Sequence, residues 1–308
     1  MKPTPPTTNP KLNTDPANTP PRPANYRWLR RGVLLAAVLL VTVFVLTLFT
    51  FNGEGDKRTV WQTSGADPKQ QPNLLDIKAT IQGIDPGKGE MNVRLEFTPN
   101  GALDGGEGWS TQSDIAIYTS SSLKPEIILK AGQRITAQDV ALPLYDGDYS
   151  LYPFDEHTAE LWFVAISPEQ ETALPLRVEL AGQVFGYRVQ GKPDADNSVD
   201  LAALVLTVER SPLTRIWAVF VMILLWAMSL SVAGVASSML LGRRKLEFAA
   251  FTWMGSMLFA FVGFRSAAPG APPIGSLIDV LAFFWAELIV AVSLVTVVLT
   301  YLTRGQKT

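Results

Sequence analysis

Apolar residues form four long stretches in this chain of 308 residues. Residues 32–51 are an unbroken apolar run, and about twenty helical residues reach ~30 Å, the thickness of the hydrocarbon layer of a bilayer. The other three stretches are residues 212–241, 248–264 and 277–302. We expect all four to be transmembrane (TM) helices. Residues 32–51 are interpreted as a retained anchor, because the apolar core of a cleaved signal peptide spans only ~7–15 residues.

Residues 52–211 have a different pattern, in which apolar and polar positions alternate. Such alternation is typical of strands that turn one face toward a core. The predicted strands are Leu75–Gln82, Met91–Thr98, Asp114–Thr119, Glu126–Leu129, Glu160–Ile166, Leu176–Leu180, Val184–Val189 and Val199–Val208. About eight antiparallel strands separated by turn residues predict an all-β, sandwich-like domain. Ala181-Gly182 predicts a tight hairpin between two of them.

Charge separates the two kinds of segment. Residues 52–211 hold 24 of the 28 acidic and 13 of the 26 basic residues, a net charge of −11, whereas the rest of the chain carries +9. Residues 1–31, the loop 242–247 and the end 303–308 are basic. The positive-inside rule therefore predicts a plasma-membrane (inner-membrane) protein with both termini cytoplasmic and residues 52–211 extracytoplasmic. An acidic outer domain also argues against nucleic acid as a partner.

Residues 1–31 form a cytoplasmic tail that begins with a Pro-, Thr- and Asn-rich stretch. The near absence of large apolar residues there predicts disorder, and binding of a Pro-reading partner or phosphorylation is the alternative interpretation. The chain has no Cys and one His, His157, which excludes disulfides, thiol nucleophiles and His-rich metal sites. We expect His157 at the surface or at an edge.

The carboxylates of the outer domain are scattered over alternating polar faces, which is typical of a solvated surface. Asp146, Asp148, Asp155 and Glu156 could gather around calcium, but a polar turn is the favoured interpretation of this cluster. We therefore predict no enzymatic activity, no cofactor and no metal site.

The most specific string in the outer domain is Tyr152-Pro153-Phe154-Asp155. Pro153 sets a turn, Tyr152 and Phe154 can enter a neighbouring core, and Asp155 can accept backbone N–H groups and begin the next strand. The string resembles the Phe-Pro-Phe-Asp motif of pentameric ligand-gated ion channels, in the loop that relays ligand binding to the pore. Those channels have four helices after the domain, whereas this chain has three after it and one before it.

The outer connection 265–276 between the last two apolar stretches is stiffened by prolines. Ser276 is a candidate N-cap of the last helix, with Asp279 three positions later in a capping-box arrangement. Asp279 also lies within reach of Arg265, so we expect an ion pair across this hairpin. Small residues, Gly234 with Ser238 and Gly255 with Gly263, predict close helix contacts within one bundle or between copies.

Glu287 lies ~15 Å along the last helix, near the middle of a bilayer. An ionisable group there costs roughly 2.5–3.5 kcal/mol, so we expect it to be protonated or paired. Ser256 lies at a similar depth on the neighbouring helix and is the candidate hydrogen-bond partner. A proton or cation relay and a neutral hydrogen-bonding staple are equal alternatives for Glu287.

These motifs together resemble a bacterial, largely actinobacterial, family of multi-pass membrane proteins known only as a domain of unknown function. The resemblance covers roughly residues 30–302 and is most specific over RSAAPGAPPIGSLIDVLAFFWAE. The matching positions are Tyr152, Pro153, Phe154, Asp155, Arg265, Pro269, Gly270, Pro272, Pro273, Gly275, Asp279, Trp285 and Glu287. The resemblance implies the same topology and no assigned activity.

The chain is thus expected to be a non-enzymatic membrane protein that binds or scaffolds in the cell envelope. Its outer β domain would dock on a four-helix TM bundle through the Tyr152–Asp155 loop and the hairpin 265–276. Its partners would be the lipid bilayer and either a second copy or another envelope protein. The alternative is an ion or proton channel or transport component with Glu287 in the pathway.

Overall fold

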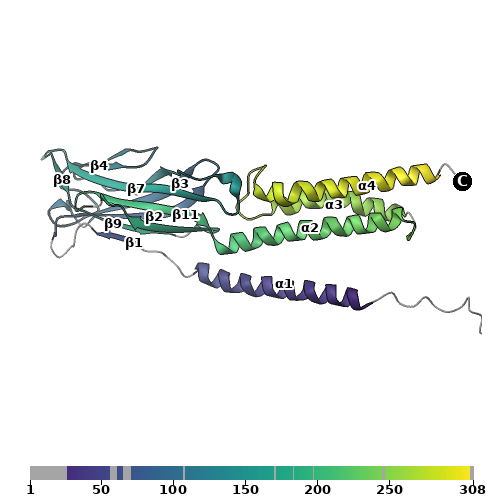
Figure 1. Cartoon of the computed structure of the whole chain (residues 1–308). Coiled ribbons are helices and arrows are strands. Elements are labelled where there is room, and N and C mark those ends of the chain that lie inside the picture. The colour runs from purple at the N-terminus through teal and green to yellow at the C-terminus, as the bar shows by residue number, and fades with distance from the viewer. Residues whose placement is uncertain are drawn as a thin grey trace, which may run out of the picture. The chain divides into compact units, whose positions relative to one another are not determined.

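The computed structural model of the chain describes residues 26–55, 61–64, 71–106, 108–169, 171–182, 184–196, 198–244 and 247–305 (Figure 1). The chain divides into two compact units, Met1–Leu46 and Thr47–Thr308. The helix α1 (Tyr26–Gly55) contains the first apolar stretch and extends beyond the predicted residues 32–51 at both ends. The Pro-rich part of the predicted tail, residues 1–25, lies outside the described residues.

The β domain consists of two sheets. The first has the strand order β1 (Trp61–Ser64), β9 (Leu176–Ala181), β2 (Leu75–Asp85), β3 (Glu90–Pro99) and β6 (Gln138–Pro143). The second has the order β10 (Tyr187–Pro193), β11 (Ala202–Arg210), β7 (Glu156–Ser167), β4 (Ile115–Thr119) and β5 (Glu126–Leu129), and β8 (Thr172–Leu174) pairs with β7. Two short 3₁₀ turns, η2 (Gly101–Leu103) and η3 (Tyr149–Leu151), lie between strands.

Alternating side chains of both sheets fill the core between them. Ile77 and Ala79 of β2 are buried, while Lys78 between them is exposed. Leu161 and Phe163 of β7 enter the same cluster from the second sheet. This period of two places one face of each strand in a shared apolar layer. The predicted β domain is confirmed as two packed sheets.

Three details of the predicted sheets are wrong. The strands β2 and β9 pair in parallel, not antiparallel. The strands β9 and β10 belong to different sheets, so Ala181-Gly182 is not a tight hairpin. Gly182 has φ +131° and its Cα lies against the backbone of Ile81, where a Cβ would clash, and from there the chain crosses to the other sheet. The short strands β1, β6 and β8 were not predicted, because β6 lacks regular alternation and the other two span only four and three residues.

Three helices follow the β domain: α2 (Pro212–Leu240), α3 (Phe248–Ser266) and α4 (Phe284–Gly305). A π-helical turn at Asp279–Phe283 directly precedes α4. Residues of α2, α3 and α4 form one apolar cluster, which includes Leu225, Phe261 and Val290. Both α2 and α3 pack against α4 (Figure 1). The core thus formed belongs to these three helices.

In the described part of the chain, four helices are long and apolar enough to cross a membrane. They are Arg30–Phe49, Pro212–Leu240, Phe248–Ser266 and Asp279–Thr303. Open space surrounds the Cβ positions of Gly234, Gly255 and Gly263. The close contacts predicted for these glycines are therefore absent from the packing of α2, α3 and α4 within one chain.

Candidate functional site

The β domain continues into the helices with one intervening residue. Arg210 ends β11, Ser211 caps α2, and Pro212 occupies its first turn. The Ser211 hydroxyl accepts a hydrogen bond from the Thr214 backbone N–H at 3.2 Å, as expected of an N-cap. Gly186, just before β10, accepts one hydrogen bond from Ser211 N and another from Thr214 Oγ1. These bonds fix the start of α2 against the β domain.

A buried ion pair lies at this connection. Arg210 and Asp155 are each 1% exposed, and Arg210 Nε donates to both carboxylate oxygens of Asp155, at 3.0 and 2.9 Å. The Arg210 guanidinium also lies over two aromatic rings, 5.0 Å from the centre of Tyr152 and 4.5 Å from that of Tyr187. Such cation–π contacts contribute more where water is excluded. We call Asp155, Arg210, Tyr152 and Tyr187 the junction.

The guanidinium of Arg210 uses only part of its hydrogen-bonding capacity. Neither of its Nη atoms has a hydrogen-bond partner among the described residues. The hairpin backbone approaches this side chain at Gly270, which has φ +81° and where a Cβ would clash with Arg210 Nη1. Removing an ion from water costs several kcal/mol, which a buried pair recovers only with good geometry and further hydrogen bonds. Burial of the Arg210 charge is therefore tolerated only while Asp155 supplies the counter-charge.

Tyrosine hydroxyls connect the β domain to the hairpin. Tyr152 is fully buried and its hydroxyl donates to the Pro269 carbonyl at 2.6 Å. The Tyr149 hydroxyl donates to the Ala271 carbonyl at 3.2 Å. Tyr152 also joins the apolar cluster of the helices, as expected, whereas Phe154 is 51% exposed and does not enter a core. The peptide bond between Tyr152 and Pro153 is cis.

Burial changes the titration of these tyrosines. Loss of solvent raises the pKa of Tyr187 to about 12, with the nearby Arg210 charge acting in the opposite direction. Burial likewise raises the pKa of Tyr152 well above its ordinary value and, to a lesser degree, that of Tyr149. All three phenols are therefore neutral at physiological pH, and Tyr152 and Tyr149 keep the protons that they donate.

His157 is also part of this region, and its expected surface position is wrong. It is 5% exposed, and its Nε2 lies 3.4 Å from Asp155 Oδ2. Its ring fits against the backbone of Gly147, where a Cβ would clash. Among the described residues, Asp155 therefore interacts with two side chains, Arg210 and His157, whereas its sequence context predicted contacts with backbone N–H groups.

The neighbouring acidic residues have separate local roles. Asp148 accepts a hydrogen bond from Ser150 N at 2.9 Å and caps η3, and hydrogen bonding from the Ser150 side chain and then from its backbone N–H lowers the pKa of the Asp148 carboxyl. Asp146 accepts one from Thr158 Oγ1 at 3.2 Å. Among the described residues, no cluster of three or more His, Asp or Glu side chains could share a metal ion. The acidic turn therefore has the geometry of a capped turn.

The hairpin 265–276 is braced from within by the predicted ion pair, which is confirmed. Arg265 donates through Nε and Nη2 to the two oxygens of Asp279, at 2.9 and 2.8 Å, and through Nη2 to the Pro273 carbonyl. The predicted capping box is wrong. Neither of its two reciprocal bonds forms among the described residues, because Asp279 accepts from Gly275 N in place of Ser276 N, and the Ser276 hydroxyl has no hydrogen-bond partner. The brace therefore holds the second half of the hairpin, next to the residues 269 and 271 that the tyrosines contact.

The predicted contact between Glu287 and Ser256 is wrong. Ser256 donates to the Trp253 carbonyl of its own helix at 2.8 Å, a common arrangement for a helical serine. Glu287 keeps one buried oxygen, Oε1, without a hydrogen-bond partner among the described residues. Trp226 Nε1 donates at 3.0 Å to the Leu281 carbonyl in the π-helical turn, six residues before Glu287.

The sequence reasoning missed three residues of this region: Arg210, Tyr187 and Tyr149. One signal was present, because Arg210 directly precedes the Ser-Pro start of an apolar helix, a poor place for an unpaired charge. Its partner could not have been identified in this way, since Asp155 lies 55 positions away.

Matches to known families divide the chain at the connection between the β domain and α2. Residues 65–208 match a family described as Domain of unknown function (DUF4436), and residues 210–304 match one described as Domain of unknown function (DUF8686). A comparison with curated proteins gives no match. The first match covers the β domain and the second begins at Arg210, so the Arg210–Asp155 pair joins the two matched regions. The two matched regions adjoin, and each is similar to a domain of unknown function, one over the β sheets and one over the last three helices.

Proposed function

We propose that this is a multi-pass membrane protein whose β domain binds a ligand or partner outside the membrane and transmits binding to α2, α3 and α4. Its place would be the cell envelope, with residues 52–211 outside and both termini inside. The observation that carries the proposal is the buried Arg210–Asp155 pair at the connection between the two domains. A passive anchor needs only an exposed polar linker and no buried charge.

The membrane placement is supported by composition. Four described helices reach the required length and hydropathy, and the acidic residues are concentrated between the first and second of them. Basic residues flank the helices on the other side, as the positive-inside rule requires. Burying the apolar surface of these helices in lipid removes it from water, which favours insertion.

Coupling is supported by three contacts that converge on one place. Ser211 and Thr214 fix the start of α2 to Gly186, and Tyr152 holds the hairpin at Pro269. The ion pair connects the end of β11 to the residue that precedes β7. A movement of β7 or β10 relative to the helices would have to break at least one of these contacts.

The absence of cysteine makes the topology directly testable, because every introduced cysteine is the sole reactive thiol. Ser122 and Arg244 are exposed positions in the β domain and after α2. On intact cells, a membrane-impermeant maleimide should label Ser122→Cys and not Arg244→Cys. Labelling of both, or of Arg244→Cys alone, would contradict the proposed orientation.

Coupling is tested by hydrogen exchange of the full chain in nanodiscs. Asp155→Asn should accelerate exchange in the hairpin 265–276 and at the start of α2, although the substitution lies in the β domain. Asp146→Asn is the matched control, since the Asp146 carboxylate lies in the same turn region and accepts its hydrogen bond from Thr158 of β7. If Asp155→Asn changed exchange in the β domain alone, the relay would be excluded.

A second candidate is an ion channel formed by several copies. Two observations favour it. Asp155 of the channel-like Tyr-Pro-Phe-Asp string pairs with Arg210, two residues before α2 begins. In α3, only Met254 and Phe261 are buried. Three helices enclose no axial pore, so a channel requires a ring of copies. Native mass spectrometry in nanodiscs should then give a symmetric oligomer, and Glu287→Gln should alter proton or cation flux. A monomer, or unchanged flux across a pH range, would exclude this candidate.

A further inference from the structure

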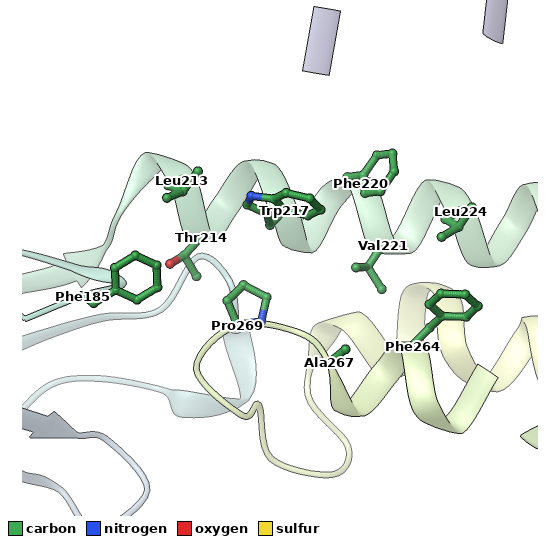
Figure 2. Close-up of a pocket in the computed structure, with 10 residues that line it drawn as sticks. All are labelled: Phe185, Leu213, Thr214, Trp217, Phe220, Val221, Leu224, Phe264, Ala267 and Pro269. Carbon is green, nitrogen blue, oxygen red and sulfur yellow. The ribbon is translucent and has the colours of Figure 1, made fainter. Parts of the chain in front are cut away.

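A cavity of about 360 Å³ lies beside the junction (Figure 2). Its walls come from the first turns of α2, the end of α3, the hairpin and the turn before β10. Figure 2 shows Thr214 and Trp217 on α2, Phe264 on α3, Pro269 on the hairpin, and Phe185 reaching the cavity from the β domain. Three parts of the chain that are distant in the sequence therefore line one space: α2, the end of α3 with the adjoining hairpin, and the turn before β10.

The lining is almost entirely hydrocarbon and aromatic. The hydroxyl of Thr214 is already engaged, because it donates to the Gly186 carbonyl at 3.1 Å. The Pro269 carbonyl is likewise engaged, by Tyr152. Water needs two to four polar partners in a cavity, and apolar cavities take up apolar molecules instead. The favoured occupant is therefore an apolar group with no need for hydrogen bonds.

The size of the cavity limits the occupant further. Ligand pockets typically measure ~300–1,000 Å³, so a flexible hydrocarbon chain or a small apolar molecule fits, whereas a helix ~10 Å across does not. Phe185 is 70% exposed and stands at the edge of an otherwise acidic domain, next to the helix ends. Exposed aromatic residues at this level are typical of the region where a protein meets lipid.

We propose that this cavity binds an acyl chain of a membrane lipid and that the bound chain stabilises the junction. The inference rests on the proposed membrane placement, which makes lipid chains the most concentrated apolar molecules around α2 and α3. A bound chain would contact Phe185 of the β domain and Pro269 of the hairpin together. Lipid would in this way become a structural part of the connection between the two domains.

The test uses phosphatidylcholine with a diazirine in the middle of one acyl chain. The full chain is reconstituted in vesicles that contain this probe, irradiated, and its adducts are mapped by mass spectrometry. We expect adducts concentrated in residues 213–224 and 264–269. Leu224→Trp should reduce this labelling about fivefold or more, because the larger side chain fills the site. Ile223→Trp is the matched control, since Ile223 is 44% exposed and does not line the cavity.

Labelling of α4 and the thermal unfolding curve report whether Leu224→Trp still folds. If Leu224→Trp misfolds, Ala267→Leu replaces it, because this substitution fills the same cavity from the hairpin. Adducts on α4 without adducts at residues 213–224 and 264–269 would overturn this inference and leave the proposed membrane placement standing. An equal loss of labelling in Leu224→Trp and Ile223→Trp would also overturn the inference. The absence of adducts on every helix would contradict the membrane placement and, with it, this inference.

Discussion

Arg210 and Asp155 form a fully buried ion pair although 55 positions separate them, with Arg210 Nε 2.9 Å from Asp155 Oδ2. One residue ends the last strand of the β domain, and the other precedes the strand β7 of the same sheet. The pair therefore forms only when β7 and β11 are correctly in register, with Val208 opposite His157. This arrangement makes the start of α2 dependent on the fold of the β domain.

Removal of one charge at the junction should be strongly destabilising. Asp155→Asn leaves the Arg210 guanidinium buried without its counter-charge, which typically costs ~3–5 kcal/mol. Chemical unfolding of the full chain in detergent, followed by tryptophan fluorescence, measures this loss. The double variant Asp155→Leu with Arg210→Met should recover most of it, because no buried charge remains. An Asp155→Asn protein as stable as the wild type would show that the pair is not buried in solution.

The two tyrosines that contact the hairpin should contribute unequally to the stability of the folded protein. Tyr152→Phe removes the donor to the Pro269 carbonyl inside a buried cluster, and an unpaired buried acceptor costs ~1–3 kcal/mol. Tyr149→Phe removes an exposed hydrogen bond and should have a much smaller effect. Thermal unfolding of both variants gives the comparison. Equal shifts in Tm would contradict the assigned difference in burial.

Gly270 should tolerate substitution less well than Gly275. Both have positive φ, +81° and +88°, so alanine is strained at either position by ~1–3 kcal/mol. Only at Gly270 would the new Cβ also meet Arg210, whereas Gly275 has open space. Gly270→Ala should therefore lower the Tm more than Gly275→Ala. Identical Tm values for the two variants would mean that the hairpin does not approach Arg210 in solution.

The raised pKa of Tyr187 should make the protein less stable in alkaline solution. The pKa of Tyr187 is raised from 10.0 to about 12 in the folded protein, so the folded state holds this proton more tightly than the unfolded state. The resulting stabilisation is fully present below pH 10 and is lost as the pH rises from 10 toward 12. Tyr187→Phe should weaken this dependence. Unfolding free energies of both proteins between pH 9 and 11.5 measure it, and parallel curves would show that Tyr187 is not the group responsible.

The elements of this protein followed largely from local pattern. Residues 212–241 are apolar over their whole length, and Leu75–Gln82 alternates at a period of two, so helix and strand were predictable from neighbouring residues alone. The ion pair of Arg265 with Asp279 was also within reach, because one short Pro-rich connection separates the two residues. Such features depend on spacing along the chain.

Tertiary structure decided everything that depends on which strands become neighbours. The parallel pairing of β2 with β9 and the burial of His157 depend on contacts between segments far apart in the sequence, which no local period specifies. The same is true of the meeting of Arg210 with Asp155 and of the apolar cavity beside it. A charged residue looks the same in a sequence whether it is solvated or buried against its partner. The sequence by itself thus determined the elements and the distribution of charge, and only the packing of the sheets and helices brought the junction together.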